Sequence, residues 1–349
     1  MDHQSTNVEL LFNCIQSNNI ELVKALLKQN IDPNNTNNSN KLPLFIAIKE
    51  NLPSMIELLI KNGADVNKQD KYGRSSLHHS VIYNLPNIVE LLLKNGADIN
   101  KPDINKCTPL YNAINENLPN IVELLIKNGA DINHQDNSRN TPLHEAIRED
   151  LPNIIELLIK NGADIHKPNS INFTPLHTAI DIHNPNINIV ELLIKLGADI
   201  NKPDNYYNTP FLLICKKNYL NITELLIKNG ADVNKPGIYG TTPLHYAVCT
   251  MFDNIAELLL KNGANPNKPS NDGKTPLDFA LALRQLPNSY IINLFNSYNK
   301  KLFLYICIAL KSHNIADNAL FLIGKNILNT FTNKEIITII NQSNKLIEK

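Results

Sequence analysis

The sequence predicts an all-α-dominated repeat solenoid, in which each unit has two short helices and a short hairpin finger. Two landmarks in constant phase support this prediction: the tetrapeptide Thr-Pro-Leu-His or a near variant, and the tetrapeptide Asn-Gly-Ala-Asp or a variant. The first landmark begins at Leu42, Ser75, Thr108, Thr141, Thr174, Thr209, Thr242 and Thr275. Successive copies are 33 residues apart, except for one interval of 35. A constant period of this length is typical of stacked helical repeats.

The unit from Ser75 to Asn100 illustrates how the helices are specified. Ser75 is placed to cap the first helix through its hydroxyl, and most other units have Thr there, followed by Pro at the first helical position. Asn84 tolerates the left-handed conformation that ends a helix, and Pro86 cannot continue one. Asn87 is then placed to cap the second helix. These signals predict a helix-turn-helix.

The second helix of the same unit carries an apolar stripe. Ile88, Leu91 and Leu92 lie at spacings that place them on one helical face, which must be buried against neighbouring units. Gly96 ends this helix, because glycine readily adopts the left-handed conformation. Residues 101–107 are then expected to form a two-stranded finger that projects from the stack.

These landmarks resemble the ankyrin repeat over roughly residues 7–299 of the chain. Stepping back one period from Leu42 places a degenerate first unit in the same register, with its second helix at residues 20–28 and Asn30 at the glycine position. The resemblance implies residues 1–40 as a degenerate N-terminal capping repeat, residues 41–299 as eight repeats and residues 300–349 as a helical C-terminal cap. A stack needs such caps because its end faces have no neighbour.

The C-terminal segment has one simple interpretation and one alternative. Residues 302–308 imitate residues 42–48, which predicts a degenerate tenth helix pair without a finger, with residues 318–326 as its second helix. Residues 332–335 form a capping box that opens a last helix. The alternative is an F-box-like tail, as in ankyrin proteins of large DNA viruses that hand targets to a host ubiquitin ligase. The pair of Glu335 and Ile336 fits that motif, but Thr and Asn occupy its Leu-Pro positions.

The amino-acid composition indicates which cellular compartment and which classes of partner are expected. The 33 basic and 33 acidic side chains balance, so no excess of positive charge indicates nucleic acid or an anionic membrane. Five cysteines form an odd set without a C-x-x-C pair, which favours the cytoplasm over a disulfide-forming compartment. No apolar run is long enough to span a bilayer. The abundance of Asn, Ile and Lys resembles ankyrin proteins of giant DNA viruses, which would place a monomeric protein in a host cytoplasm.

No residue pattern indicates catalysis, a metal or a cofactor. One histidine per unit belongs to the signature, and a full repeat separates each from the next, so a hydrogen-bonding structural role is expected. Glutamate precedes lysine by four residues on seven second helices, as a solvated convex face requires. No nucleophile motif or phosphate-binding loop occurs. The chain is therefore expected not to be an enzyme. The signature histidines are His78, His144, His177 and His245.

The resemblance implies that a protein partner binds the finger tips and the concave side of the first helices. At those positions the units differ from one another, and large or charged side chains there are the expected anchors. The candidate partner-binding residues are Tyr72, Tyr83, Ile104, Arg148, Phe173, Tyr206, Tyr207, Lys216 and Tyr239. The turn glycine two residues before the Thr occurs as Gly73, Gly240 and Gly273, whereas Lys106, Arg139, Asn172 and Tyr207 replace it elsewhere. The sequence thus leaves the turn conformation of the middle fingers open.

Overall fold

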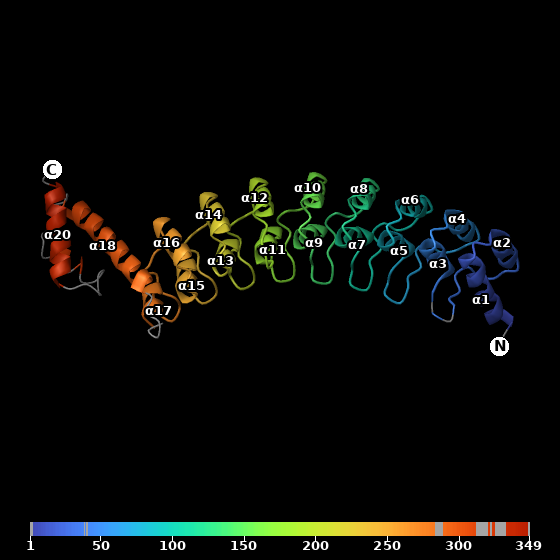
Figure 1. Cartoon of the computed structure of the whole chain (residues 1–349), viewed down its shortest axis with the longest axis horizontal. Coiled ribbons are helices and arrows are strands. Elements are labelled where there is room, and N and C mark those ends of the chain that lie inside the picture. The colour runs from blue at the N-terminus through green and yellow to red at the C-terminus, as the bar shows by residue number, and fades with distance from the viewer. Residues whose placement is uncertain are drawn as a thin grey trace. The chain divides into compact units, whose positions relative to one another are not determined.

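The computed structural model describes residues 3–37, 39, 41–282, 289–311, 320–321, 323–324 and 333–347. These residues form helices, turns and loops, and none of them lies in a β-strand. The chain divides into two compact units, Met1–Ala198 (unit 1) and Asp199–Lys349 (unit 2). Both units contain the predicted helical repeats (Figure 1).

Unit 1 contains six helix pairs, and a finger links each pair to the next. The pairs are α1 (His3–Gln16) with α2 (Ile20–Lys28), α3 (Pro43–Lys49) with α4 (Pro53–Lys61), α5 (Ser76–Ile82) with α6 (Pro86–Lys94), α7 (Pro109–Asn115) with α8 (Pro119–Lys127), α9 (Pro142–Arg148) with α10 (Pro152–Lys160), and α11 (Pro175–Asp181) with α12 (Ile187–Lys195). Helix α2 has the predicted bounds, and Asn30 after it has a φ of 59°, as the glycine position requires.

Unit 2 continues the pattern and ends in longer helices. Its helices are α13 (Pro210–Cys215) with α14 (Leu220–Lys228), α15 (Pro243–Cys249) with α16 (Asp253–Lys261), then α17 (Pro276–Ala282), α18 (Ser289–Lys311) and α20 (Asn333–Ile347). Helix α17 packs against α15 and α18, and α18 also packs against α16.

The helix boundaries follow the predicted capping signals, with one exception. The Thr108 hydroxyl caps α7 by accepting the N–H of Tyr111, and Ser75 forms a capping box with His78 at the start of α5. Asn84 has a φ of 53° and ends α5 as expected. Helix α6 begins at Pro86, so Asn87 lies within its first turn and does not cap it. Proline has no backbone N–H to satisfy at this position, and the N–H of Ile88 donates to the carbonyl oxygen of Leu85 in place of a side-chain cap.

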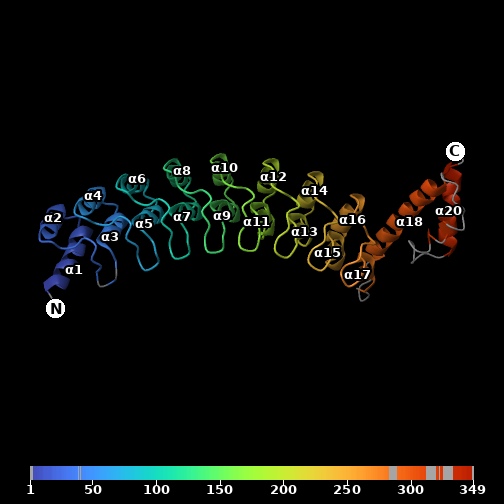
Figure 2. The ribbon, with the colours of Figure 1, turned by 180° about the vertical axis from the view of Figure 1, so that it is seen from behind.

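Within unit 1 the helices form two rows. Each first helix packs against the first helix of the next pair, from α1 through α11, while α8 packs against α6 and α10. The rows are visible from both sides (Figures 1 and 2). Two members of the predicted apolar stripe of α6, Ile88 and Leu92, are at most 1% exposed, whereas the third, Leu91, is half-buried. Each fully buried side chain contributes about 1.5–3 kcal/mol of burial free energy, and the outer face of the second helices remains in solvent.

Asparagine side chains tie several repeats to the next through the loop after the second helix. The Asn67 amide donates to the carbonyl oxygen of Gly96 at 3.0 Å, and its oxygen accepts the N–H of Asp98 at 2.7 Å. The same two bonds recur at Asn34, Asn133, Asn201 and Asn234. This ladder, in which one side chain pairs two backbone groups of the following repeat, was not predicted from the sequence.

The C-terminal helices differ from the expected tenth repeat. Helix α18 is continuous, so the expected boundary between residues 299 and 300 lies inside it and residues 302–308 do not begin a separate helix. No Pro or Gly occurs between Ser289 and Lys311 to interrupt it. Helix α20 packs on α18 around a buried cluster that includes Phe303, Ile336 and Ile339. Most of the expected helix at 318–326, and Thr332 of the capping box, lie outside the described residues.

Candidate partner-binding surface

The finger tips are linked to one another by backbone hydrogen bonds. In unit 1 the N–H of Ile104 donates to the carbonyl oxygen of Tyr72 at 3.2 Å, and Asn137 donates to Asn105 at 3.0 Å. In unit 2 the N–H of Asn271 donates to the carbonyl oxygen of Tyr239 at 2.9 Å. Within each unit, the linked tips therefore have a backbone held by a neighbouring finger, although the described fingers contain no β-strand.

An acidic or amide side chain at the base closes most fingers. Asp70 Oδ1 accepts the N–H groups of Tyr72 at 2.8 Å and Arg74 at 2.9 Å, and the N–H of Asp70 donates to the Arg74 carbonyl. The same double acceptance occurs at Asp103, Asn169 and Asp204. Asp and Asn side chains favour such turns because they satisfy nearby backbone donors. The finger backbone is thus fixed locally as well as by its neighbour.

The middle fingers keep the turn conformation without glycine. Lys106, Arg139, Asn172 and Tyr207 have φ values between 61° and 65°, close to the 70° of Gly240. For residues other than Gly, Asn or Asp, such as Lys106, Arg139 and Tyr207, this left-handed conformation costs about 1–2 kcal/mol. The hydrogen bonds at the finger base and tip hold the turn in place, which answers the question left open by the sequence.

Three predicted anchors in unit 1 are exposed on the surface. Tyr72 is 48% exposed, Tyr83 is 41% exposed and Ile104 is 61% exposed. Phe173 is different: its ring stacks on His177 at a centroid distance of 5.2 Å and is partly buried. It is therefore a packing residue of its own finger rather than a projecting anchor, because the histidine ring at the start of α11 offers it an apolar face.

The exposed finger tips of unit 2 carry three large aromatic side chains. Tyr206 is 56% exposed, Tyr207 is 61% exposed and Tyr239 is 69% exposed. Their fingers precede α13 and α15, which pack on each other, and the fingers lie side by side in both views (Figures 1 and 2). Large exposed aromatic side chains on a fixed backbone are well suited to anchor a protein interface, because little conformational entropy is lost on binding.

Lys216 has internal contacts on α13 that the sequence analysis did not foresee. Its Nζ donates to Asn208 Oδ1 at 2.9 Å and lies 4.3 Å from the centroid of the Tyr246 ring. The side chain is half-buried, so the ammonium group already has a partner and a cation–π contact. Lys216 would have to give up its contacts with Asn208 and Tyr246 in order to bind a partner.

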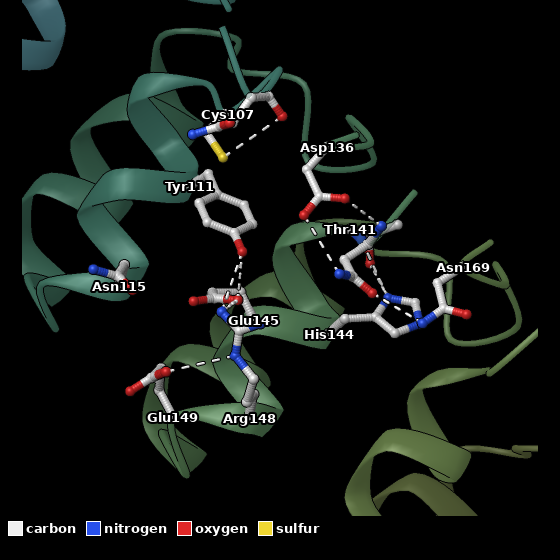
Figure 3. A network of polar contacts seen from close by, with 12 residues as sticks. Cys107, Tyr111, Asn115, Asp136, Thr141, His144, Glu145, Arg148, Glu149 and Asn169 are labelled. Atoms are coloured by element: carbon white, nitrogen blue, oxygen red, sulfur yellow. Dashed lines mark hydrogen bonds and ion pairs between the residues drawn. The ribbon is translucent and has the colours of Figure 1, made fainter. Parts of the chain in front are cut away.

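A network between α7 and α9 was missed by the sequence analysis (Figure 3). The Tyr111 hydroxyl donates to Glu145 Oε2 at 2.6 Å, and the Arg148 guanidinium pairs with the same oxygen and donates to the Tyr111 hydroxyl. Glu145 is 1% exposed, and its Oε1 has no hydrogen-bond partner among the described residues. Arg148, a predicted anchor, thus also neutralises a buried carboxylate. The departure of Tyr111 from the signature histidine was the only signal in the sequence.

Burial and the carboxylate also determine the ionisation of Tyr111. Burial and the hydrogen bond to Glu145 raise the pKa of the Tyr111 phenol well above its ordinary value. The hydroxyl therefore stays protonated at neutral pH and acts as a donor to the carboxylate. This part of the first-helix face is a preformed polar surface.

The signature histidines are structural, as predicted. In His144, Nδ1 accepts the N–H of Thr141 at 3.2 Å and Nε2 donates to the carbonyl oxygen of Phe173 at 3.1 Å, in the next finger. His78 and His245 make the same bridges. Burial lowers the pKa of each of these three imidazoles, despite the hydrogen bond to the carbonyl oxygen. Each ring is neutral at pH 7 and fastens its helix to the following finger.

Within the described residues, no three His, Cys, Asp or Glu side chains come together in a way that would hold a metal ion. No helix in that part of the chain combines the length and apolar character that crossing a membrane requires.

Comparisons with known proteins agree with this architecture. A family model for ankyrin repeats in three copies matches residues 11–103, 101–169, 154–237, 176–270 and 211–301. The crystal structure of the ankyrin repeat domain of Bcl-3, described as a unique member of the IkappaB protein family, is similar, with a TM-score of 0.55 and 26% sequence identity. That alignment covers 60% of this chain and 95% of the other. No curated protein matches this chain.

Proposed function

Because this chain belongs to the ankyrin repeat family, whose repeats are generic protein–protein interaction modules, we propose that it is a non-catalytic scaffold for a protein partner. The partner binds the finger tips and the exposed side of the first helices. The observation that carries the proposal is the set of linked tips within each unit, where large exposed side chains, Tyr72 in unit 1 and Tyr239 in unit 2, sit on backbone held by a neighbouring finger. Such preorganisation favours binding because it reduces the ordering cost.

The aromatic tips of unit 2 are the strongest candidates for the energetic centre. Tyr206, Tyr207 and Tyr239 are all more than half exposed, in a region where the repeat pattern does not require an aromatic residue. Tyrosine is enriched among residues that dominate binding energy. We assign Tyr72 and Ile104 a second contact area in unit 1, and we assign the second-helix face no role in binding.

Affinity capture with three forms of the full chain tests this proposal. The forms are the wild type, a variant with Tyr206→Ala and Tyr239→Ala, and a variant with Glu123→Ala and Lys127→Ala, which removes an exposed 2.7 Å ion pair on α8. Mass spectrometry then identifies proteins that the wild type and the α8 variant retain but the tyrosine variant loses. Partners that depend on the α8 pair and not on the tyrosines would place binding on the second-helix face and refute the assignment.

The alternative function, recruitment of a host ubiquitin ligase through the C-terminal segment, is less well supported. In the expected motif Glu335 and Ile336 would be displayed to a ligase subunit. Ile336 is instead 1% exposed and belongs to the cluster between α18 and α20. The apolar residues of α20 are equally explained if α18 and α20 cover the end of the stack, since terminal repeats need a protected face.

We also propose that the protein acts in a reducing compartment such as the cytoplasm. All five cysteines are free thiols, and three of them, Cys14, Cys215 and Cys307, are buried. Burial raises the pKa of Cys14 and of Cys215, which keeps these thiols protonated. Thiols that pack as small apolar side chains are typical of such compartments.

A further inference from the structure

A pocket of about 320 Å³ lies in unit 1 between α3, the finger that follows α4, and α5. Four basic side chains line it: Lys41 precedes α3, Lys49 is the last residue of α3, and Lys71 and Arg74 come from the finger. One carboxylate, Asp70, also lines it. The pocket therefore concentrates positive charge in a chain whose formal net charge is zero.

The single carboxylate is already used inside the protein. Oδ1 of Asp70 accepts the N–H groups of Tyr72 and Arg74, and Oδ2 lies 3.1 Å from His79 Nε2. Asp70 is only 13% exposed at its side chain. It holds the finger to α5 and is not positioned to neutralise the surrounding lysines as well.

Three of the four basic side chains lack a carboxylate partner among the described residues. Among the described residues, Lys41, Lys71 and Arg74 form no ion pair, and Lys49 lies 3.8 Å from Glu50 with half of its side chain in solvent. The Nε of Arg74 is buried and has no acceptor in the described part of the chain. An unsatisfied guanidinium donor beside three ammonium groups is an arrangement that an anionic group would complete.

Aromatic rings form most of the remaining wall. Phe45 lies 4.3 Å from His79 between ring centroids, and His79 stacks on Tyr83 at 6.3 Å. The Tyr72 ring lies under both Lys71 Nζ, at 4.9 Å, and the Arg74 guanidinium, at 5.6 Å. Burial lowers the pKa of His79, with Asp70 partly opposing, so this ring is a neutral aromatic surface at pH 7. The pocket thus accepts a charged group together with an apolar neighbour.

This combination occurs at one place in the repeat series. Moving one period along the chain replaces Lys49 by Ile82, Lys71 by Ile104 and Arg74 by Cys107, and only the position of Lys41 remains basic, as Arg74. The stacking requirements of the repeat are the same at both places. The four cations therefore do not serve the fold, and a specific ligand is the better explanation.

We propose that this pocket binds a glutamate or aspartate side chain from an acidic peptide segment of the protein partner. This inference rests on the proposed protein-binding function, and it adds that the partner segment bound here is negatively charged. The volume accommodates one or two side chains, and the neutral balance of the whole chain disfavours a polyanion such as nucleic acid. The basic groups pair with the carboxylate, and the rings of Phe45 and Tyr83 contact the apolar flank.

The absence of tryptophan from the sequence allows a local fluorescence test. The probe is a synthetic peptide of glutamates around one leucine, with glutamine in place of every glutamate as its control. In a full-length Tyr83→Trp variant the tryptophan emission should change saturably with the acidic peptide and not with the glutamine peptide. A Tyr298→Trp variant, on α18 in unit 2, should not respond.

Charge variants in the Tyr83→Trp background test the assignment of the cations. Lys71→Gln with Arg74→Gln should weaken binding about tenfold or more, and higher salt should weaken it further. Lys61→Gln with Lys94→Gln removes the same charge from α4 and α6 and should change affinity less than about twofold. Lys49→Gln, at a half-exposed side chain, provides a second variant if the first proves unfolded by circular dichroism.

Several outcomes would overturn the inference. One is the absence of any response to the acidic peptide, and another is an equal response to the glutamine peptide. A third is an equal loss of affinity in the variant with Lys71→Gln and Arg74→Gln and in the variant with Lys61→Gln and Lys94→Gln. The last is tighter binding of a phosphoserine peptide or of oligothymidylate than of the acidic peptide. If the acidic peptide fails while partner capture still depends on Tyr206 and Tyr239, the scaffold function stands and only the pocket assignment falls. If the peptide binds but capture is independent of both tyrosines, the pocket assignment stands and the assignment of Tyr206 and Tyr239 as anchors falls.

Discussion

The hydroxyl of Tyr111 donates a 2.6 Å hydrogen bond to Oε2 of Glu145, which lies 34 positions later in the sequence. The bond joins the first helices of two successive repeats, and Arg148 pairs with the same oxygen. Because Glu145 is 1% exposed, its negative charge depends on these two partners. A buried carboxylate with a defined set of donors makes the contribution of each donor measurable.

Removing the tyrosine hydroxyl should destabilise unit 1. We expect Tyr111→Phe to lower the free energy of unfolding by about 1.5–3 kcal/mol, the usual scale for a hydrogen bond to a charged group. Urea unfolding followed by circular dichroism measures the change. Tyr83→Phe, at a 41% exposed side chain, is the control and should stay within about 0.5 kcal/mol. Equal effects of the two substitutions would show that the bond contributes nothing to stability.

The buried histidines should make stability pH-dependent. Burial holds the pKa of His144 below its ordinary value of 6.5, so the unfolded chain takes up a proton at higher pH than the folded chain. The stabilisation is complete above pH 6.5 and is lost as the pH falls below that value towards the pKa of the folded state. The urea concentration at the unfolding midpoint should therefore decrease as the pH is lowered from 7.5 to 5.5. His144→Gln should show a lower midpoint at pH 7.5 and a shallower decline, whereas an unchanged decline would contradict the assignment.

The glycines of two finger turns should differ in their tolerance of alanine. Gly240 and Gly273 both have positive φ, 70° and 79°, so a side chain is strained in both. A Cβ on Gly240 would lie 2.8 Å from the backbone N of Asn271 in the next finger, whereas one on Gly273 meets no described atom within 4 Å. Gly240→Ala should therefore cost about 1 kcal/mol more than Gly273→Ala in unfolding free energy. A smaller cost for Gly240→Ala would indicate that the tips move apart freely.

Two neighbouring isoleucines of α20 test whether the C-terminal helices form a packed cap. Ile336 is 1% exposed and contacts the Phe303 cluster, while Ile337 is 49% exposed. We expect Ile336→Ala to cost about 2–5 kcal/mol and Ile337→Ala less than about 0.5 kcal/mol. Hydrogen exchange should show the loss of protection in α18 and α20, with α3 to α10 unaffected, since contacts in a stack are between neighbours. Similar effects at both positions would mean that α20 does not pack as described.

Affinity for the recovered partner should depend on the tips of unit 2. Tyr206→Ala with Tyr239→Ala should cost about 2 kcal/mol or more in binding free energy, the scale of interface anchors. Thermal unfolding should change little, because both side chains are more than half exposed. Glu123→Ala with Lys127→Ala should leave binding within about 0.5 kcal/mol. Isothermal titration calorimetry separates these cases, and a requirement for the α8 pair alone would reverse the assignment of the binding face.

Local signals in the sequence were sufficient for the repeat itself. A capping hydroxyl, a proline and an apolar stripe act within a few residues of one another, so they predict a helix wherever they recur. The bounds of α2 and the left-handed conformation of Asn30 and Asn84 followed from such signals. The exposed positions of Tyr72 and Tyr239 followed from the same phase, because a repeat places equivalent residues in equivalent environments.

What only the tertiary structure decided is how non-repeated side chains meet across a period. The bond from Tyr111 to Glu145, the stacking of Phe173 on His177 and the cationic pocket around Arg74 depend on particular residues in two elements that the chain brings together. Helix α18 likewise runs through the expected boundary, because its apolar residues are buried by α16, α17 and α20. Sequence period determines which positions become neighbours, but only packing determines whether two different side chains there form a bond, a buried contact or an open surface.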